Sequence, residues 1–80
     1  MKNIQIQYYA LLREERGIQR ETLTTESNTA RQLYEALTAK HKFSLTCNQL
    51  TLAINDEFMP WDSTITSGDS VVFIPPVAGG

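Results

Sequence analysis

The residues that could do chemistry lie at the end of the sequence, which reads Ile74-Pro75-Pro76-Val77-Ala78-Gly79-Gly80. Two consecutive prolines cannot continue a ladder of strand hydrogen bonds, and they hold the backbone extended. The side chains that follow shrink from valine to alanine to glycine, so the segment tapers. A terminal Gly-Gly places an unhindered carboxylate at a thin tip that fits a narrow channel in another protein's active site. The alternative interpretation is a frayed chain end, because disorder and glycine are common at termini.

Side chains that usually carry out catalysis are scarce elsewhere in the sequence. The single histidine, His41, has no nucleophile near it and stands where a helix should end, so we expect it to be solvated at the surface. The single cysteine, Cys47, has no second cysteine to pair with, and we expect it to fill space as a small residue. Together these two residues cannot supply the four ligands of a structural zinc site. We therefore expect neither a metal site nor a bound cofactor.

The composition indicates one small globular domain. The 80 residues have a mass of 9.0 kDa, with 41% hydrophobic and 20% charged side chains, which leaves no room for a second core. The formal net charge of -2 disfavours nucleic-acid binding. The most apolar segment, residues 71–78, is far shorter than a membrane span and contains two prolines. Glutamines interrupt the N-terminal segment where a signal peptide needs a continuous apolar stretch, so we expect a cytoplasmic protein that binds no membrane.

The first third of the chain predicts a strand, a short helix and a second strand. Residues 3–10 alternate between apolar and polar side chains, with Ala10 as the last residue on the buried face, which is typical of a half-buried strand. Residues 11–17 suit a helical turn that ends at Gly17, because glycine tolerates the left-handed conformation. Residues 19–25 are rich in threonine and predict a second strand paired with the first.

A longer helix is predicted to begin at Thr29. Thr29 and Gln32 have the spacing of a capping box, in which each side chain bonds to the backbone N–H of the other residue. The apolar residues that follow have the spacing of one helix face: Ala30, Leu33, Tyr34 and Leu37. The helix should end near residues 40–42, where cations complement the negative end of the helix dipole.

The second half of the chain predicts the remaining strands. Residues 50–54 have the alternating pattern of a strand. The predicted strand ends before Asn55 and Asp56, two residues that favour turns. Phe58 and Met59 predict a short edge piece, since Pro60 lacks the hydrogen-bond donor that a central strand needs. Residues 70–74 are apolar on both faces, which favours a strand buried in the centre of the sheet in parallel pairing.

The order of these elements predicts an α+β fold with β-grasp, or ubiquitin-like, topology. This fold is a mixed sheet of four to five strands with one main helix packed on one face. In the simplest right-handed arrangement, the last strand lies beside the first. We expect residues 1–75 to form this domain and residues 76–80 to form an extended C-terminal tail.

The longest motif of the sequence carries a family resemblance. Residues 68–80 read Gly-Asp-Ser-Val-Val-Phe-Ile-Pro-Pro-Val-Ala-Gly-Gly. With this ending, and over nearly its full length, the chain resembles the small subunits of molybdopterin synthase, which are sulfur carriers of the ubiquitin-like β-grasp superfamily. Weaker agreement comes from three short pieces: residues 9–10 (Tyr-Ala), 13–14 (Arg-Glu) and 53–55 (Ala-Ile-Asn). Glu15 and Arg16 depart from the family pattern, which usually has apolar residues there.

The resemblance implies carrier chemistry at the tail. An E1-like adenylating enzyme would use ATP to adenylate Gly80, and a persulfide sulfur donor would turn the adenylate into a thiocarboxylate. In this family the thiocarboxylate donates sulfur to cyclic pyranopterin monophosphate in the large subunit, with which the chain would form a heterotetramer. The chain would be no enzyme on its own. The reactive tip would be Gly79 and Gly80, and the tail that binds the partner would be Pro75, Pro76, Val77 and Ala78.

Three other functions stay open at this point. A thiazole-biosynthesis sulfur carrier has the same fold and ending, but it is usually shorter and lacks the Pro-Pro-Val spacer, so length and spacer argue against it. A ubiquitin-like protein modifier would join the activated Gly80 to a lysine of a target protein. A simple binding module would use the surface of its sheet and would tolerate loss of the tail.

Overall fold

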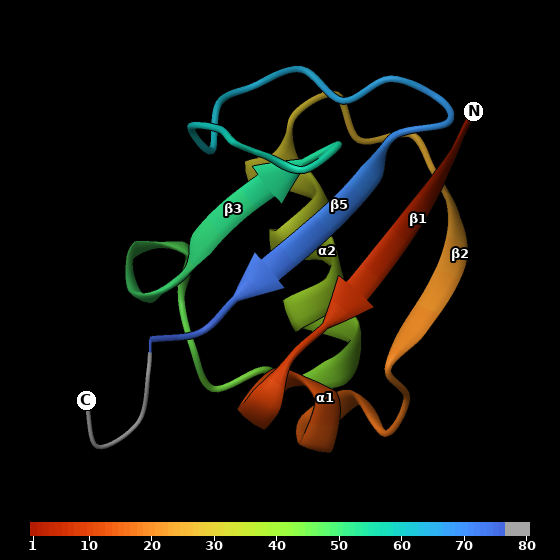
Figure 1. Ribbon diagram of the computed structural model, residues 1–80. Coiled ribbons are helices and arrows are strands. Elements are labelled where there is room, and N and C mark those ends of the chain that lie inside the picture. Colours follow the sequence, from red (N-terminus) through yellow and green to blue (C-terminus); the bar gives the residue numbers. More distant parts are fainter. Residues whose placement is uncertain (77–80) are drawn as a thin grey trace.

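The computed structural model describes residues 1–76 and consists of one mixed sheet, one long helix and two short helical segments (Figure 1). The elements in chain order are β1 (Lys2–Tyr8), α1 (Ala10–Arg16), β2 (Arg20–Thr25), α2 (Ala30–His41), the 3₁₀ helix η1 (Cys47–Gln49), β3 (Thr51–Ile54), β4 (Glu57–Phe58) and β5 (Ser70–Ile74). The strand order across the five-stranded sheet is β2-β1-β5-β3-β4. The predicted α+β fold with one main helix is therefore confirmed.

β5 lies at the centre of the sheet, between β1 and β3. It runs parallel to β1, with Gln5 opposite Ser70, and antiparallel to β3. Side chains alternate between the two faces of a strand, and Val71 and Phe73 are fully buried on the face that packs into the core. The predictions that the last strand lies beside the first, in parallel and in the centre, are confirmed.

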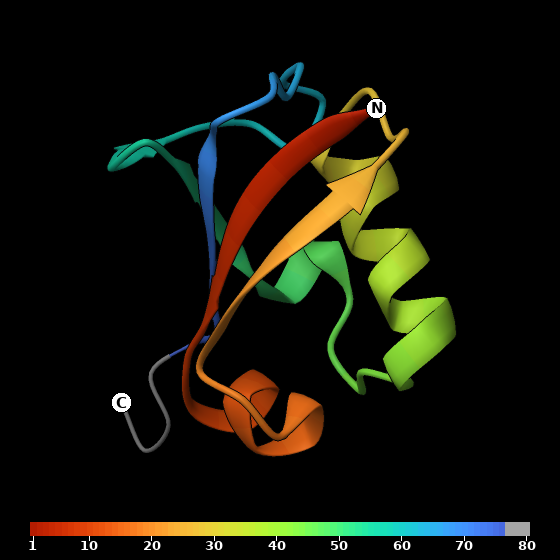
Figure 2. The same ribbon diagram turned by 90° about the vertical axis from the view of Figure 1, so that its right-hand side faces the viewer.

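α2 covers one face of the sheet, as Figure 2 shows from the side. It begins with the predicted capping box: the Thr29 hydroxyl accepts from the Gln32 backbone N at 3.2 Å, and the Gln32 side chain accepts from the Thr29 backbone N at 3.4 Å. All four residues of the predicted apolar stripe are buried. The helix ends at His41 because Lys42 adopts the left-handed conformation, with φ 59°.

Aromatic rings form the centre of the core between α2 and the sheet. Tyr34 of α2 meets Phe73 of β5 edge to face, with 5.0 Å between ring centroids, and stacks on Phe43 at 5.7 Å. Trp61 stacks on Phe73 at 5.8 Å, and Tyr8 lies 6.2 Å from Phe73. Such pairs contribute about 0.5–1.5 kcal/mol each beyond the apolar area that they bury. The inner face of β5 is therefore held by rings from several segments.

The boundary between β1 and α1 differs from the prediction. β1 ends at Tyr8, and Ala10, expected on the buried face of the strand, is instead the exposed first residue of α1 with φ 51°. The apolar and polar alternation of the sequence runs on through this point although the backbone turns, so the pattern alone could not locate the strand end. Gly17 caps α1 in the left-handed conformation, with φ 87°, as predicted.

Charged residues at the end of α1 hold this helix to its neighbours. Arg16 donates two hydrogen bonds to the Glu21 carboxylate, at 3.0 and 2.9 Å, and the Tyr8 hydroxyl donates to the same carboxylate at 2.6 Å. Glu15 accepts from the hydroxyl of Ser44 at 2.7 Å and from its backbone N at 3.2 Å. The Arg16 hydrogen bond holds the pKa of Glu21 below its usual value, because it stabilises the charged carboxylate. Polar contacts thus fix the last turn of α1 to β2 and to the connector after α2.

The edge strand β4 begins one residue earlier than the sequence predicts. The predicted edge piece at Phe58 and Met59 is β4, Glu57–Phe58. The two turn residues, Asn55 and Asp56, have φ angles of 52° and 70°, so the chain reverses within two residues. Glu57 therefore lies directly opposite Ile54 of β3.

Candidate functional site

The predicted tail leaves the sheet at the end of β5. Because β1 and β5 are parallel, their C-terminal ends lie at the same edge of the sheet, and the chain leaves β5 on the side of the molecule where α1 follows β1 (Figure 1). Pro75 is partly buried there and Pro76 is exposed. The roles expected of four further residues stay predictions, since they lie outside the described part of the chain: Val77, Ala78, Gly79 and Gly80.

A groove of about 720 Å³ lies beside the root of the tail. Tyr9 and Leu11, which line it, are 41% and 40% exposed although both are large and apolar. We call this groove the tail-root groove, and its lining residues are Tyr9, Ala10, Leu11, Arg13, Glu14, Leu45, Ile74, Pro75 and Pro76. It is mainly apolar and carries one cation and one carboxylate, a combination typical of surfaces that bind another protein.

The sheet face opposite α2 carries a second apolar surface. Ala53 of β3 lies opposite Phe58 of β4 on one side and opposite Val72 of β5 on the other, and residues opposite one another point to the same face. Ile74 lies two residues beyond Val72 on that face. Phe58 is 76% exposed. We call these four residues the docking face, and in Figure 2 no helix formed by residues 1–76 covers it.

The docking face and the tail-root groove are continuous, because Ile74 belongs to both. Apolar side chains therefore follow one another from the exposed Phe58 of β4, past Ala53 of β3, which is only 7% exposed, to the partly buried Val72 and Ile74 of β5. A protein that bound this surface would also lie next to the tail. This arrangement suits a domain that binds another protein close to Pro75 and Pro76.

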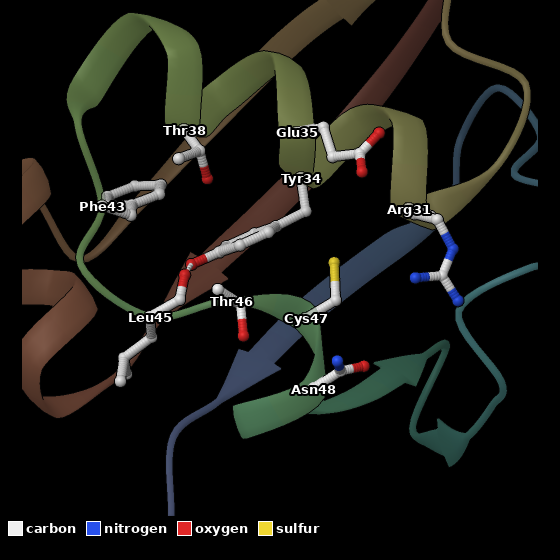
Figure 3. Close-up of a pocket in the computed structure, with 9 residues that line it drawn as sticks. All are labelled: Arg31, Tyr34, Glu35, Thr38, Phe43, Leu45, Thr46, Cys47 and Asn48. Atoms are coloured by element: carbon white, nitrogen blue, oxygen red, sulfur yellow. Dashed lines mark hydrogen bonds between the residues drawn. The ribbon is translucent and has the colours of Figure 1, made fainter.

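A second cleft, of about 330 Å³, lies between α2 and the connector to β3 (Figure 3). The sulfur of Cys47 points toward α2 in this view, and the residue belongs to the buried core, as predicted. Burial raises the pKa of the Cys47 thiol, although the nearby Arg31 guanidinium opposes this effect. A thiol that stays protonated at neutral pH is a poor nucleophile, so the structure assigns Cys47 no reactive role.

His41 is less exposed than the sequence predicts. Its ring lies 5.9 Å from the ring of Phe43, and burial lowers its pKa. Among residues 1–76, no group of three or more His, Cys, Asp or Glu side chains could hold a metal ion. No helix in the same range is long and apolar enough to cross a membrane.

Known proteins share both the sequence pattern and the fold. The ThiS family matches residues 6–80, from β1 to the last glycine. The chain belongs to the ThiS family. This membership agrees with the resemblance drawn from the C-terminal motif and with the five-stranded sheet.

Two curated relatives match nearly the whole chain. The molybdopterin synthase sulfur carrier subunit of Haemophilus influenzae is 34% identical over 80 residues, which are 96% of this chain and 99% of the relative. The subunit of the same name from Escherichia coli is 29% identical, with the same coverage of both chains. Both relatives are thus similar to this chain over nearly its whole length.

Solved structures support the fold. Small archaeal modifier protein 1 of Haloferax volcanii superimposes with a TM-score of 0.81 at 18% identity, over 96% of this chain and all of the other. A complex of subunits 1 and 2 of the molybdopterin-converting factor of Helicobacter pylori contains a chain with a TM-score of 0.68 at 19% identity, over 98% of this chain and 99% of that one. The ubiquitin-like β-grasp topology predicted from the sequence is therefore confirmed.

Sequence reasoning favoured the sheet face as a binding surface but did not identify the residues of the docking face. It predicts that residues 70–74 are buried on both faces, whereas Val72 and Ile74 are only partly buried, because the second face of the sheet has no helix over it. Phe58 could have indicated this surface from the sequence alone. A large apolar residue in a short edge strand, two residues before Pro60, has little chance of burial within its own domain.

Proposed function

We propose that this chain is the sulfur-carrying subunit of a molybdopterin synthase and that Gly80 carries the sulfur. The likeness to the Haemophilus influenzae sulfur carrier subunit carries this proposal, because it spans 96% of the chain, and the family match runs through Gly80. The continuous docking face and tail-root groove support it. They give a carrier one apolar surface by which a partner could bind next to the tail.

The proposed chemistry begins with the Gly80 carboxylate, which is a poor electrophile at neutral pH. An E1-like enzyme joins it to AMP from ATP and releases pyrophosphate. A persulfide attacks the acyl carbon and AMP leaves, and a second thiol then reduces the acyl disulfide to release the thiocarboxylate. Its sulfur attacks cyclic pyranopterin monophosphate in the large subunit, and hydrolysis returns the Gly80 carboxylate. Two such rounds supply the sulfurs of the dithiolene.

In this proposal the catalytic groups belong to the partners, and the chain supplies a terminus and a binding surface. ATP is used by the adenylating enzyme, and no cofactor is bound to this chain. Affinity comes from the docking face and the tail-root groove. The stiff Pro75-Pro76 pair reduces the conformational entropy that is lost when the tail enters a channel. Gly79 and Gly80 form the reactive tip, and the four residues before them guide it.

Three partners follow from this function: the large subunit, the E1-like adenylating enzyme and a persulfide sulfur donor. The Helicobacter pylori structure, a complex of subunit 1 with subunit 2, supports the first of them. We propose a heterotetramer in the cytoplasm, with two copies of each synthase subunit. Nucleic acids and membranes have no part in the proposal.

The intact mass of the protein tests the proposal. After incubation with an E1-like enzyme, ATP and a sulfide source, we expect a mass gain that matches replacement of one carboxylate oxygen by sulfur. The gain should require ATP and should vanish in a variant without Gly79 and Gly80. Unfolding of that variant, followed by the fluorescence of Trp61, should match the wild type, because the buried side chains of the described core come from residues 4–73.

Other outcomes would redirect the interpretation. No mass gain with an enzyme that is active on a known carrier would contradict sulfur carriage. Conjugates in which Gly80 is joined to a lysine of another protein would indicate a protein modifier. Unchanged function of the truncated variant would indicate a simple binding module.

A further inference from the structure

A network of hydrogen bonds ties the start of β5 to both neighbouring strands. On the β3 side, the Asn55 side chain donates to Asp69 Oδ1 at 3.0 Å and accepts from the backbone N of Ser70 at 3.0 Å. On the β1 side, the backbone N of Gln5 donates to the Asp69 carbonyl at 3.0 Å. The other Asp69 carboxylate oxygen accepts from the backbone N of Thr66 at 2.7 Å, which closes the turn before β5.

The side chain of Asn55 takes the place of a backbone group. The β3–β5 register, extended by one pair, sets Asn55 opposite Ser70, and the backbone N of Asn55 donates to the Ser70 carbonyl at 2.8 Å. In a regular antiparallel ladder the Asn55 carbonyl would accept the return bond from Ser70. Asn55 has left-handed backbone geometry, with φ 52°, and its side-chain oxygen accepts this bond instead. Asparagine suits the position because it tolerates this conformation and carries an amide.

The apolar pattern of β5 specifies its register poorly. Four consecutive residues of the strand, residues 71–74, are all apolar, so both faces of the strand are apolar. A strand slipped by one residue would still direct apolar side chains into the core, and a slip of two residues would restore the original alternation. The apolar composition of β5 therefore discriminates weakly among registers. The register depends instead on specific contacts, which are the packing of Phe73 in the aromatic cluster and the polar network at the start of the strand.

Register matters because the tail continues directly from β5. A slip of two residues would move the tail root by about 7 Å along the strand. Two extended residues span at most about 7 Å, so the slip would withdraw the tip by the full length of Gly79 and Gly80. It would also move Val72 and Ile74 relative to Phe58 and so divide the docking face.

We infer that Asn55 is a positioning residue that fixes the register of β5 and thereby the reach of the tail from the docking face. The expected effect of Asn55 on sulfur transfer rests on the proposed sulfur-carrier function. Its effect on the register of β5 does not depend on that function. The side chain of Asn55 forms hydrogen bonds with Asp69 and Ser70. It acts through Asp69 and Ser70, at the opposite end of β5 from the reacting terminus.

Amide hydrogen exchange of Asn55→Gly tests whether Asn55 holds β5 in its place in the sheet. Glycine keeps the left-handed conformation and removes both side-chain hydrogen bonds. Asp56→Gly is the matched control, because Asp56 is the other residue of the same turn, with φ 70°, and takes no part in the network described above. We expect the β5 amides of Asn55→Gly to exchange about tenfold faster than in the wild type, a factor within the range of losing two hydrogen bonds. The α2 amides, and all amides of Asp56→Gly, should change little.

Sulfur transfer is measured in the same variants at a saturating concentration of large subunit, with the folded, thiocarboxylated protein as donor. We expect Asn55→Gly to transfer sulfur several-fold more slowly than the wild type and Asp56→Gly to equal it. Equal acceleration of exchange in β5 and α2 would show a general loss of stability and overturn the inference, as would a transfer rate equal to that of the wild type. A wild type that never takes up sulfur refutes the proposed function, while the exchange of β5 still decides whether Asn55 holds this strand in place.

Discussion

Replacement of Phe58 by alanine tests whether the docking face binds the large subunit. Phe58 is 76% exposed, so the free domain gains little from its ring. Complete burial of a phenylalanine side chain stabilises a protein by about 1.5–3 kcal/mol. Burial of the exposed three quarters of Phe58 in a complex is then worth about 1–2 kcal/mol. Since about 1.4 kcal/mol is a factor of ten in Kd, we expect Phe58→Ala to weaken binding about 5- to 30-fold.

Isothermal titration calorimetry of the large subunit with each variant gives this Kd. Ile18→Ala is the matched control, because Ile18 is also apolar and 38% exposed but lies in the turn between α1 and β2, outside both named surfaces. Urea unfolding, followed by the fluorescence of Trp61, separates binding from stability. We expect the free energy of unfolding of Phe58→Ala to stay within about 0.5 kcal/mol of the wild type.

Three results would refute this reasoning. The first is a Kd of Phe58→Ala within about twofold of the wild type, since the ring would then gain no burial. The second is an equal loss of affinity in Ile18→Ala, because the effect would then not be specific to the docking face. The third is a loss of stability as large as the loss of affinity, which would place Phe58 in the fold rather than in the interface.

Further measurements examine the core and the titratable groups. The pKa of Glu21 is lowered in the folded state by its hydrogen bonds to Arg16, so its contribution to stability is present above the unfolded value of 4.5 and is lost as pH falls through the folded value. The free energy of unfolding from urea titrations should therefore fall less steeply between about pH 5 and pH 3 in Glu21→Gln than in the wild type, and parallel curves would contradict this. Phe73→Ala removes a fully buried ring from the aromatic cluster and should cost about 3–5 kcal/mol, seen as a large drop in Tm by circular dichroism, and an unchanged Tm would disprove the packing. Cys47 should react with iodoacetamide more slowly than a small-molecule thiol and should speed up in urea, because burial raises its pKa, whereas equal rates in both conditions would argue against a buried thiol.

The elements predicted well from the sequence are those whose signals are local. The capping box at Thr29 and the stripe that follows it depend on residues within a few turns of one helix, so they could be read from spacing alone. The burial of β5 on its inner face followed from its apolar composition. Gly17 marked the end of α1 because the left-handed conformation strongly favours glycine.

Features that depend on contacts between distant segments could not be read in this way. Arg16 of α1 forms an ion pair with Glu21 of β2, on the other side of a turn. No periodic pattern in the sequence predicts such a pair. The role of Asn55 depends on which residue of β5 lies opposite it, which is a property of the assembled sheet. The docking face is hidden for a related reason, because an apolar pattern shows that side chains avoid water without showing whether a helix or another protein covers them.

The pairing of β1 with β5 has a consequence for how the domain folds. The two strands come from opposite ends of the domain, yet they are neighbours in the middle of the sheet. Contacts between residues so distant in sequence require closure of a long loop, so we expect this α+β domain to fold in roughly milliseconds, more slowly than a helical bundle of the same length. Until β5 takes its place, β1 and β3 have open edges toward each other, and neither the docking face nor the tail-root groove exists. Recognition by a partner can therefore begin only after the last strand is in place, which makes completion of the domain a condition for use of its terminus.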